Sequence, residues 1–144
     1  MTALTISRRF RAPPEKVFEY VSRTEHLLKW WGPEGTTLPE QHLAFDRPGP
    51  WMSVMMNAEG QRFKVSGHVT KVDPPHMVGF TWAWHDEHDK RGVESHVTIR
   101  LVPAANGGTE FELSHVDLPG DDVAANHEQG WSSSLRKLER LANA

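Results

Sequence analysis

The chain has 144 residues, with 16 Lys and Arg against 19 Asp and Glu, and a formal net charge of −3. This length suits one domain with a single core. The absence of cysteine excludes disulfides, thiolate catalysis and cysteine-bound zinc. No apolar run approaches the roughly 18 residues that cross a membrane, no signal peptide opens the chain, and no basic cluster with interleaved aromatics marks a nucleic-acid site. We therefore expect one cytoplasmic domain, residues 1–144, that binds neither membrane nor nucleic acid.

The first expected elements are one strand and two short helices. Apolar and polar residues alternate over 4–10, which predicts a strand that ends near Arg11. Residues 12–15 then place two prolines and a glutamate where a helix opens. A second helical turn follows, with Thr24 expected as its N-cap, and it stops at the Trp-Trp-Gly-Pro run of residues 30–33.

From residue 36 onward the pattern is that of strands. Clusters of Gly, Pro, Asn and Asp separate runs in which apolar and polar residues alternate. With the first strand these runs make seven strands joined by short connections, which favours antiparallel pairing. The six predicted strands are residues 38–45, 51–57, 63–72, 77–85, 93–102 and 109–117.

One face of the last three strands is apolar and aromatic, and the other is charged. Alternation along each strand assigns the side chains to the two faces. We expect the inward face to carry Val78, Phe80, Trp82, Trp84, Val93, Ser95, Val97, Ile99, Leu101, Phe111, Leu113 and His115. We expect the solvated face to carry Glu94, His96, Thr98, Arg100, Glu110 and Glu112.

Residues 121–142 predict one long amphipathic helix, with Asp121 expected to cap its start. Its inner face recurs at three- and four-residue steps, and comprises Val123, His127, Trp131, Ser134, Leu138 and Leu141. The fold class is therefore α+β: a curved seven-stranded antiparallel sheet wrapped on this helix, with two short helices after the first strand. Because such a sheet curls away from a straight helix, the gap between them can become a ligand cavity.

This order of elements resembles the helix-grip fold of the SRPBCC (START-like) superfamily, and local motifs resemble proteins related to the activator of heat shock protein 90 ATPase. The motifs are Ala12-Pro13-Pro14-Glu15-Lys16-Val17-Phe18, Trp30-Trp31-Gly32-Pro33, Val72-Asp73-Pro74-Pro75, Gly108-Thr109-Glu110-Phe111, and the H-x-x-G-W run from His127 to Trp131. The run 47–50 departs from the family, which usually shows a Gly-Gly pair there. The resemblance implies a hydrophobic pocket. It does not imply one chemistry, because the superfamily includes lipid carriers, hormone receptors, aromatic cyclases and chaperone regulators.

We predict a largely enclosed pocket between the long helix and the sheet. Its expected lining is Trp82, Trp84, Phe111, Leu113 and His127, and the ligand-binding set also includes His115 and Trp131. Trp131 is interpreted chiefly as a core anchor, with the neighbouring Gly130 allowing helix and sheet to approach closely. The two histidines have two readings: groups that orient a ligand or move a proton, or buried imidazoles satisfied by their neighbours.

The densest group of metal-ligating residue types is His85-Asp86-Glu87-His88-Asp89. It lies in a connection between two strands, where ligands lack the hydrogen bonds that fix them. We therefore expect a solvated acidic turn, no bound metal and no cofactor.

Three functions remain open at this stage. The leading hypothesis is binding of a small hydrophobic or aromatic molecule. The second is an enzyme of cyclase, dehydratase or hydrolase type that uses His115 or His127 on a polyketide-like substrate. The third is regulation of a chaperone ATPase with a chaperone as partner, although activators in the family pair this kind of domain with a second one. The ligand, the reaction and the oligomeric state, monomer or homodimer, are not fixed by the sequence.

Overall fold

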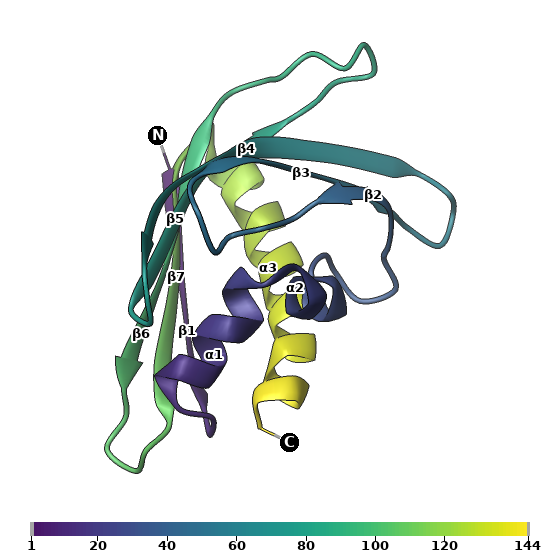
Figure 1. Ribbon diagram of the computed structural model, residues 1–144. Helices are drawn as coiled ribbons and strands as arrows, with labels where there is room; N and C mark the ends of the chain where they lie inside the picture. Colours follow the sequence, from purple (N-terminus) through teal and green to yellow (C-terminus); the bar gives the residue numbers. More distant parts are fainter. Residues whose placement is uncertain (1, 144) are drawn as a thin grey trace.

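A computed structural model describes residues 2–143, and it shows one curved antiparallel sheet wrapped around a long C-terminal helix (Figure 1). The strand order is β1-β7-β6-β5-β4-β3-β2. The predicted helix-grip architecture is thereby confirmed. The elements are β1 (Thr2–Phe10), α1 (Pro14–Ser22), α2 (Thr24–Trp30), β2 (Thr37–His42), β3 (Gly49–Met56), β4 (Arg62–Asp73), β5 (Met77–Trp84), β6 (Ser95–Pro103), β7 (Thr109–Leu118) and α3 (Asp121–Ala142). Among the described residues, no helix combines the length and the apolar character that a membrane span requires.

Both predicted helix caps are wrong. The N-cap of α3 is Gly120, and Asp121 is already the first helical residue; its carboxylate accepts a hydrogen bond from the Thr2 hydroxyl at 3.0 Å. The hydroxyl of Thr24 likewise donates to the carbonyl of Leu43 instead of capping α2. In each case the polar side chain ties the helix start to a distant part of the chain.

Several strand boundaries also differ from the prediction. Strand β6 begins at Ser95, and Val93, expected on the inward face, is 56% exposed because it belongs to the preceding loop. Strand β2 ends at His42, and the buried Phe45 lies beyond it, with its amide donating to the carbonyl of Ser22 on α1. Strand β3 begins at Gly49, whose φ of 147° favours glycine.

One half of the concave face is filled by close packing. In the C-terminal half of α3, Leu135, Leu138 and Ala142 are buried. The sheet beneath supplies the rings of Phe10 and Phe111, whose centroids are 5.3 Å apart. The end of α3 is tied to the segment after β1, where the Ala12 amide donates to the carbonyl of Ala142 at 3.2 Å.

The other half contains a cluster of aromatic rings centred on Trp31, in the loop between α2 and β2. Its ring lies 5.6 Å from Trp51, 5.9 Å from Trp82 and 5.7 Å from Trp131. Trp31 is 2% exposed, and its indole N–H donates to the hydroxyl of Ser53 at 3.0 Å. This loop therefore brings an aromatic side chain between α3 and the sheet, at the edge of the space described next.

Candidate functional site

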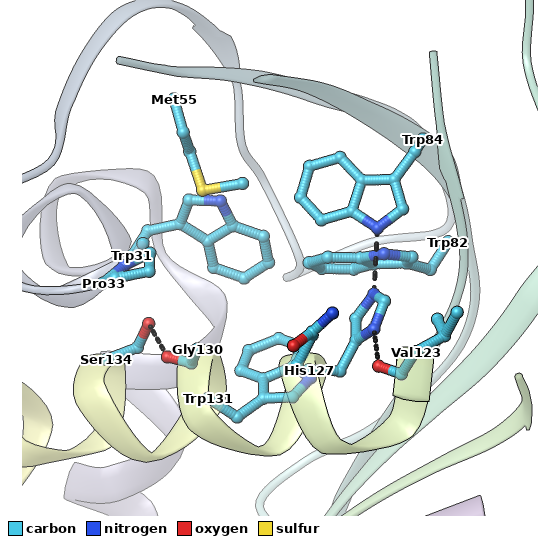
Figure 2. A pocket seen from close by; sticks show the side chains of 12 residues that line it. Trp31, Pro33, Met55, Trp82, Trp84, Val123, His127, Gly130, Trp131 and Ser134 are labelled. Carbon is cyan, nitrogen blue, oxygen red and sulfur yellow. Dashed lines mark hydrogen bonds between the residues drawn. The ribbon is translucent and has the colours of Figure 1, made fainter. Parts of the chain in front are cut away.

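A cavity of about 440 Å³ lies between the N-terminal half of α3, strand β5 and the loop that follows α2. Figure 2 shows the twelve side chains that line it. They are Trp31, Gly32, Pro33, Met55, Trp82, Trp84, Val123, Asn126, His127, Gly130, Trp131 and Ser134. Four of these twelve residues are tryptophans. None of the twelve side chains carries a formal charge in its usual state at neutral pH.

The spacing of residues on α3 produces one side of the pocket. Val123, His127, Gly130 and Ser134 follow one another at steps of three or four, so they share one face of the helix. A Cβ built on Gly130 would have Pro33 Cγ as its nearest neighbour, at 3.9 Å. The interpretation that Gly130 lets helix and sheet approach is therefore wrong: a Cβ there would meet no atom of the sheet within 4 Å and would make only ordinary van der Waals contact with the loop after α2.

The pocket is open on one side, so the prediction of an enclosed cavity is also wrong. Asn126 is exposed, and Pro33, Trp84 and His127 are partly exposed. The physical reason is that α3 is a single straight element that cannot cover the whole width of a curling sheet. A ligand could therefore enter without any part of the fold opening.

His127 is a neutral imidazole with both nitrogens occupied. Its Nε2 is 2.9 Å from Nε1 of Trp84, and its Nδ1 is 2.7 Å from the carbonyl oxygen of Val123 (Figure 2). Because an indole N–H can only donate and a carbonyl can only accept, His127 carries its proton on Nδ1. Burial lowers the pKa of His127, and the bond to Val123 opposes that shift only in part.

His115 does not line the pocket; it is fully buried behind Trp82 and Trp131. The Trp131 indole N–H donates to its Nδ1 at 3.1 Å, and its Nε2 lies 2.7 Å from the hydroxyl of Ser95. The proton of His115 must therefore be on Nε2 and donated to Ser95, whose own hydroxyl donates to the carbonyl of Trp82 at 3.2 Å. Burial, with smaller contributions from His127 and His96, lowers the pKa of His115 to about 3.

These two networks decide between the readings of the histidines. A general base needs a free nitrogen within reach of the group that it deprotonates, and a pKa near the working pH. Neither His115 nor His127 has a free nitrogen, and burial holds both in the neutral form. The arrangement is that of imidazoles satisfied by their neighbours, with each one orienting a tryptophan.

The other predicted site residues divide between pocket and core. Trp82 and Trp84 line the pocket as expected, and Trp131 both lines it and packs into the core at 5% exposure. Phe111 and Leu113 do not line it, so that part of the prediction is wrong. Both are buried on β7, in the half of the concave face that is filled by close packing.

The loop side of the pocket was not predicted from the sequence. Trp31 and Pro33 entered only as part of the motif that ends α2, and Met55 was not assigned to the pocket. The only signal for this loop was the Trp-Trp-Gly-Pro run that ends α2. Such a run indicates that the chain turns, but it does not indicate which other element the turn contacts. On α3, the periodicity that assigned His127 to the inner face also assigned Val123 and Ser134, which do line the cavity.

The acidic turn after β5 has polar groups that pair with one another and with side chains of β4. His85 contacts Asp89 through Nδ1 at 2.8 Å and Ser66 through Nε2 at 2.6 Å. A hydrogen bond from Lys64 is the main cause that lowers the pKa of Asp89. Over residues 2–143, no group of three or more His, Asp or Glu side chains is arranged to hold a metal ion.

Comparisons with known proteins agree with this architecture. A family model described as Activator of Hsp90 ATPase homolog 1-like protein matches residues 11–143. A crystal structure of the AHSA1 protein from Silicibacter pomeroyi is 50% identical, with a TM-score of 0.92 and 96% of each chain covered. A Chromobacterium violaceum protein shares the fold at 24% identity, with a TM-score of 0.86, over 100% of this chain and 99% of that one. No curated protein matches. The chain therefore belongs to the family of Activator of Hsp90 ATPase homolog 1-like proteins.

Proposed function

We propose that this protein binds a small, uncharged, largely flat aromatic molecule in the pocket between α3 and β5. The observation that carries the proposal is the lining: four indole rings, from Trp31, Trp82, Trp84 and Trp131, around a cavity of about 440 Å³. Ligand pockets in proteins are typically about 300–1,000 Å³ and mostly apolar with a few polar groups. This cavity lies toward the lower end of that range, which favours a molecule of two or three fused rings.

The absence of charge among the lining residues favours a neutral ligand. Burying a carboxylate or an ammonium without a partner is strongly unfavourable. The charged residue on the loop after α2, Glu34, is already paired, since its carboxylate contacts Arg136 at 2.8 Å and Arg140 at 2.7 Å. Asn126 and Ser134 lie on α3 and line the pocket, and the Ser134 oxygen can still accept a hydrogen bond, so these two side chains would orient one edge of a flat molecule.

Binding is favoured over catalysis by the state of the two histidines. An enzyme acting on a polyketide-like substrate needs an acid or a base at the substrate. In this pocket His127 is committed to Trp84 and Val123, and His115 lies behind the tryptophans without access to the cavity. A carrier or sensor function needs only the pocket.

The test is to fill the cavity from the helix. Gly130→Leu places an isobutyl group in the space toward Pro33, where a Cβ alone already makes van der Waals contact. We expect the Kd for N-phenyl-1-naphthylamine, a neutral fluorescent aromatic probe, to rise at least tenfold. Ala125→Leu is the matched control, because Ala125 is exposed on the same helix and does not line the pocket.

Thermal melts of both variants establish that the fold is retained. Equal affinities of wild type, Gly130→Leu and Ala125→Leu for the probe would contradict the proposal, because the probe would then bind elsewhere. Absence of saturable binding to the wild type, by this probe and by other neutral two- and three-ring aromatics, would contradict it as well.

A further inference from the structure

One buried hydrogen-bond donor in the pocket has no partner. Among the described residues, only two buried side-chain nitrogen or oxygen atoms lack a hydrogen bond: Nδ1 of His26 and Nε1 of Trp82. Trp82 is 5% exposed and lines the cavity. Buried polar groups in proteins are nearly always paired, so an unpaired one in a native fold requires an explanation.

The three other indoles around the pocket show what is missing. The N–H groups of Trp31, Trp84 and Trp131 donate to Ser53, His127 and His115 respectively. Each of these partners is a side chain that the fold supplies at 3.1 Å or closer. Trp82, in the middle of this group, has no such partner.

Six aromatic rings pack around Trp82, and the two that are partly exposed are those of Trp84 and His127. Their centroids lie 5.4 Å and 6.0 Å from that of Trp82. Figure 2 shows the Trp82 ring edge-on behind the hydrogen bond that joins Trp84 to His127. Both of these rings are partly exposed, so they are the side chains whose displacement would open the cavity toward the buried donor.

We propose that the ligand of this pocket carries an uncharged oxygen acceptor conjugated to its aromatic ring, as in an aryl ketone or aldehyde, and that Nε1 of Trp82 donates a hydrogen bond to it. This inference rests on the proposed binding function. The oxygen reaches the donor when the Trp84 and His127 side chains shift. An indole N–H can only donate, so a group that only accepts completes the site. A hydroxyl would bring a hydrogen that needs an acceptor of its own, and a carboxylate would be buried without a counter-charge.

The test compares two ligands that differ in the acceptor alone. They are 2-acetylnaphthalene and 2-isopropenylnaphthalene, in which a CH₂ group replaces the carbonyl oxygen. Titration calorimetry gives the ratio of their Kd values for the wild type and for Trp82→Phe, which keeps an aromatic ring and removes the donor. We expect Trp82→Phe to reduce the preference for the ketone by roughly fivefold to tenfold, the effect of one hydrogen bond.

Trp84→Phe is the matched control. It removes an indole N–H that already has a partner in His127, so we expect it to change the affinity of both ligands by the same factor. If Trp82→Phe does not fold, the ¹⁵N–¹H signal of the Trp82 indole in the wild type replaces the variant. It should move downfield with the ketone and not with the alkene.

The outcomes separate the two proposals. If both ligands bind but Trp82→Phe leaves their ratio unchanged, or the indole signal responds equally to both, this inference is wrong and the N–H instead faces a neighbouring ring. A preference lost equally in Trp84→Phe would also overturn it. If neither ligand binds the wild type although the fluorescent probe does, this inference alone is wrong. If the probe also fails to bind, the binding function is wrong as well.

Discussion

The two halves of α3 differ in how they meet the sheet. The C-terminal half buries Leu135, Leu138 and Ala142, and its last turn is bonded to the chain after β1. The N-terminal half carries Val123 and Gly130 beside a cavity. One helix thus serves as a core element at one end and as the side of a pocket at the other, where the sheet curls away from it.

The boundary between these halves is a polar network. His115 is fully buried, and its bonds to Trp131 and Ser95 fix the position of the indole that separates pocket from core. His127, one turn before Trp131, makes the corresponding bond to Trp84 at the partly exposed side. The pocket is therefore shaped by two imidazole–indole pairs, one in each environment.

The largest expected difference between the halves is in stability. Leu138→Ala removes a side chain with no exposed surface, and we expect it to lower the free energy of unfolding by about 2–5 kcal/mol. Val123→Ala, on the pocket half, should cost about 1 kcal/mol or less, because Val123 is only partly buried and lines an existing cavity. Urea denaturation of both variants measures this contrast. Equal losses would mean that α3 is packed uniformly along its length.

The second prediction concerns pH. The folded-state pKa of His115 is about 3, against an ordinary value of 6.5. Above pH 6.5 the histidine is neutral in both states; below it the unfolded chain binds a proton that the folded protein does not, so stability falls as the pH falls toward 3. We expect a loss of about 2 kcal/mol between pH 7.5 and 5 from this residue.

His115→Gln removes that titration. Between pH 7.5 and 5, the variant should therefore lose about 2 kcal/mol less stability than the wild type loses. His127→Gln should have a smaller effect, since burial lowers the pKa of His127 while the bond to Val123 partly offsets the shift. Identical pH profiles for the wild type and His115→Gln, measured by denaturant unfolding, would show that His115 titrates normally in the folded protein.

The third prediction exploits the glycine in the middle of α3. Gly130→Ala should raise the free energy of unfolding by about 0.8–1.0 kcal/mol, the helix-propensity difference, because the added Cβ meets only Pro33 at 3.9 Å. Ala125→Gly, on the exposed face, should lower it by a similar amount. A destabilising Gly130→Ala would mean that the helix and the loop after α2 are already in close contact there.

The fold could be predicted from the sequence because its signals are periodic. The alternation in β5, β6 and β7 and the three- and four-residue steps in α3 assign each side chain to a face without knowledge of its partners. The predictions failed where a residue lies outside the regular element: Val93 precedes β6, and Phe45 follows β2. Periodicity carries no information past the end of an element.

The candidate site could be predicted only in part for the same reason. Trp82, Trp84 and His127 were identified from alternation and helical spacing. The loop residues Trp31 and Pro33 were not, because nothing local indicates which element a chain reversal faces. The hydrogen-bond state of the histidines also depends on contacts between distant residues, such as the pairing of Trp84 with His127, 43 positions apart.

The smallest expected effect concerns the loop after α2, which is bonded to the C-terminal half of α3 through Glu34. Glu34 accepts hydrogen bonds from Arg136 and Arg140, and its amide donates to the hydroxyl of Ser133 at 2.8 Å. These bonds hold the segment that places Trp31 and Pro33 at the pocket. Hydrogen bonds from Arg136 and then Arg140 lower the pKa of Glu34 to about 2.

This stabilisation is complete above the ordinary pKa of 4.5 and is lost progressively as the pH falls from there through about 2. Between pH 5 and 8 the loop should therefore respond to salt and not to pH, since exposed ion pairs are screened. We expect amide hydrogen exchange over residues 34–36 to be somewhat faster in Glu34→Gln, and faster in the wild type at 1 M salt. Glu19→Gln, which alters an exposed pair on α1, is the control. If salt accelerates exchange in Glu34→Gln as much as in the wild type, the ion pairs do not hold the loop and its own turn does.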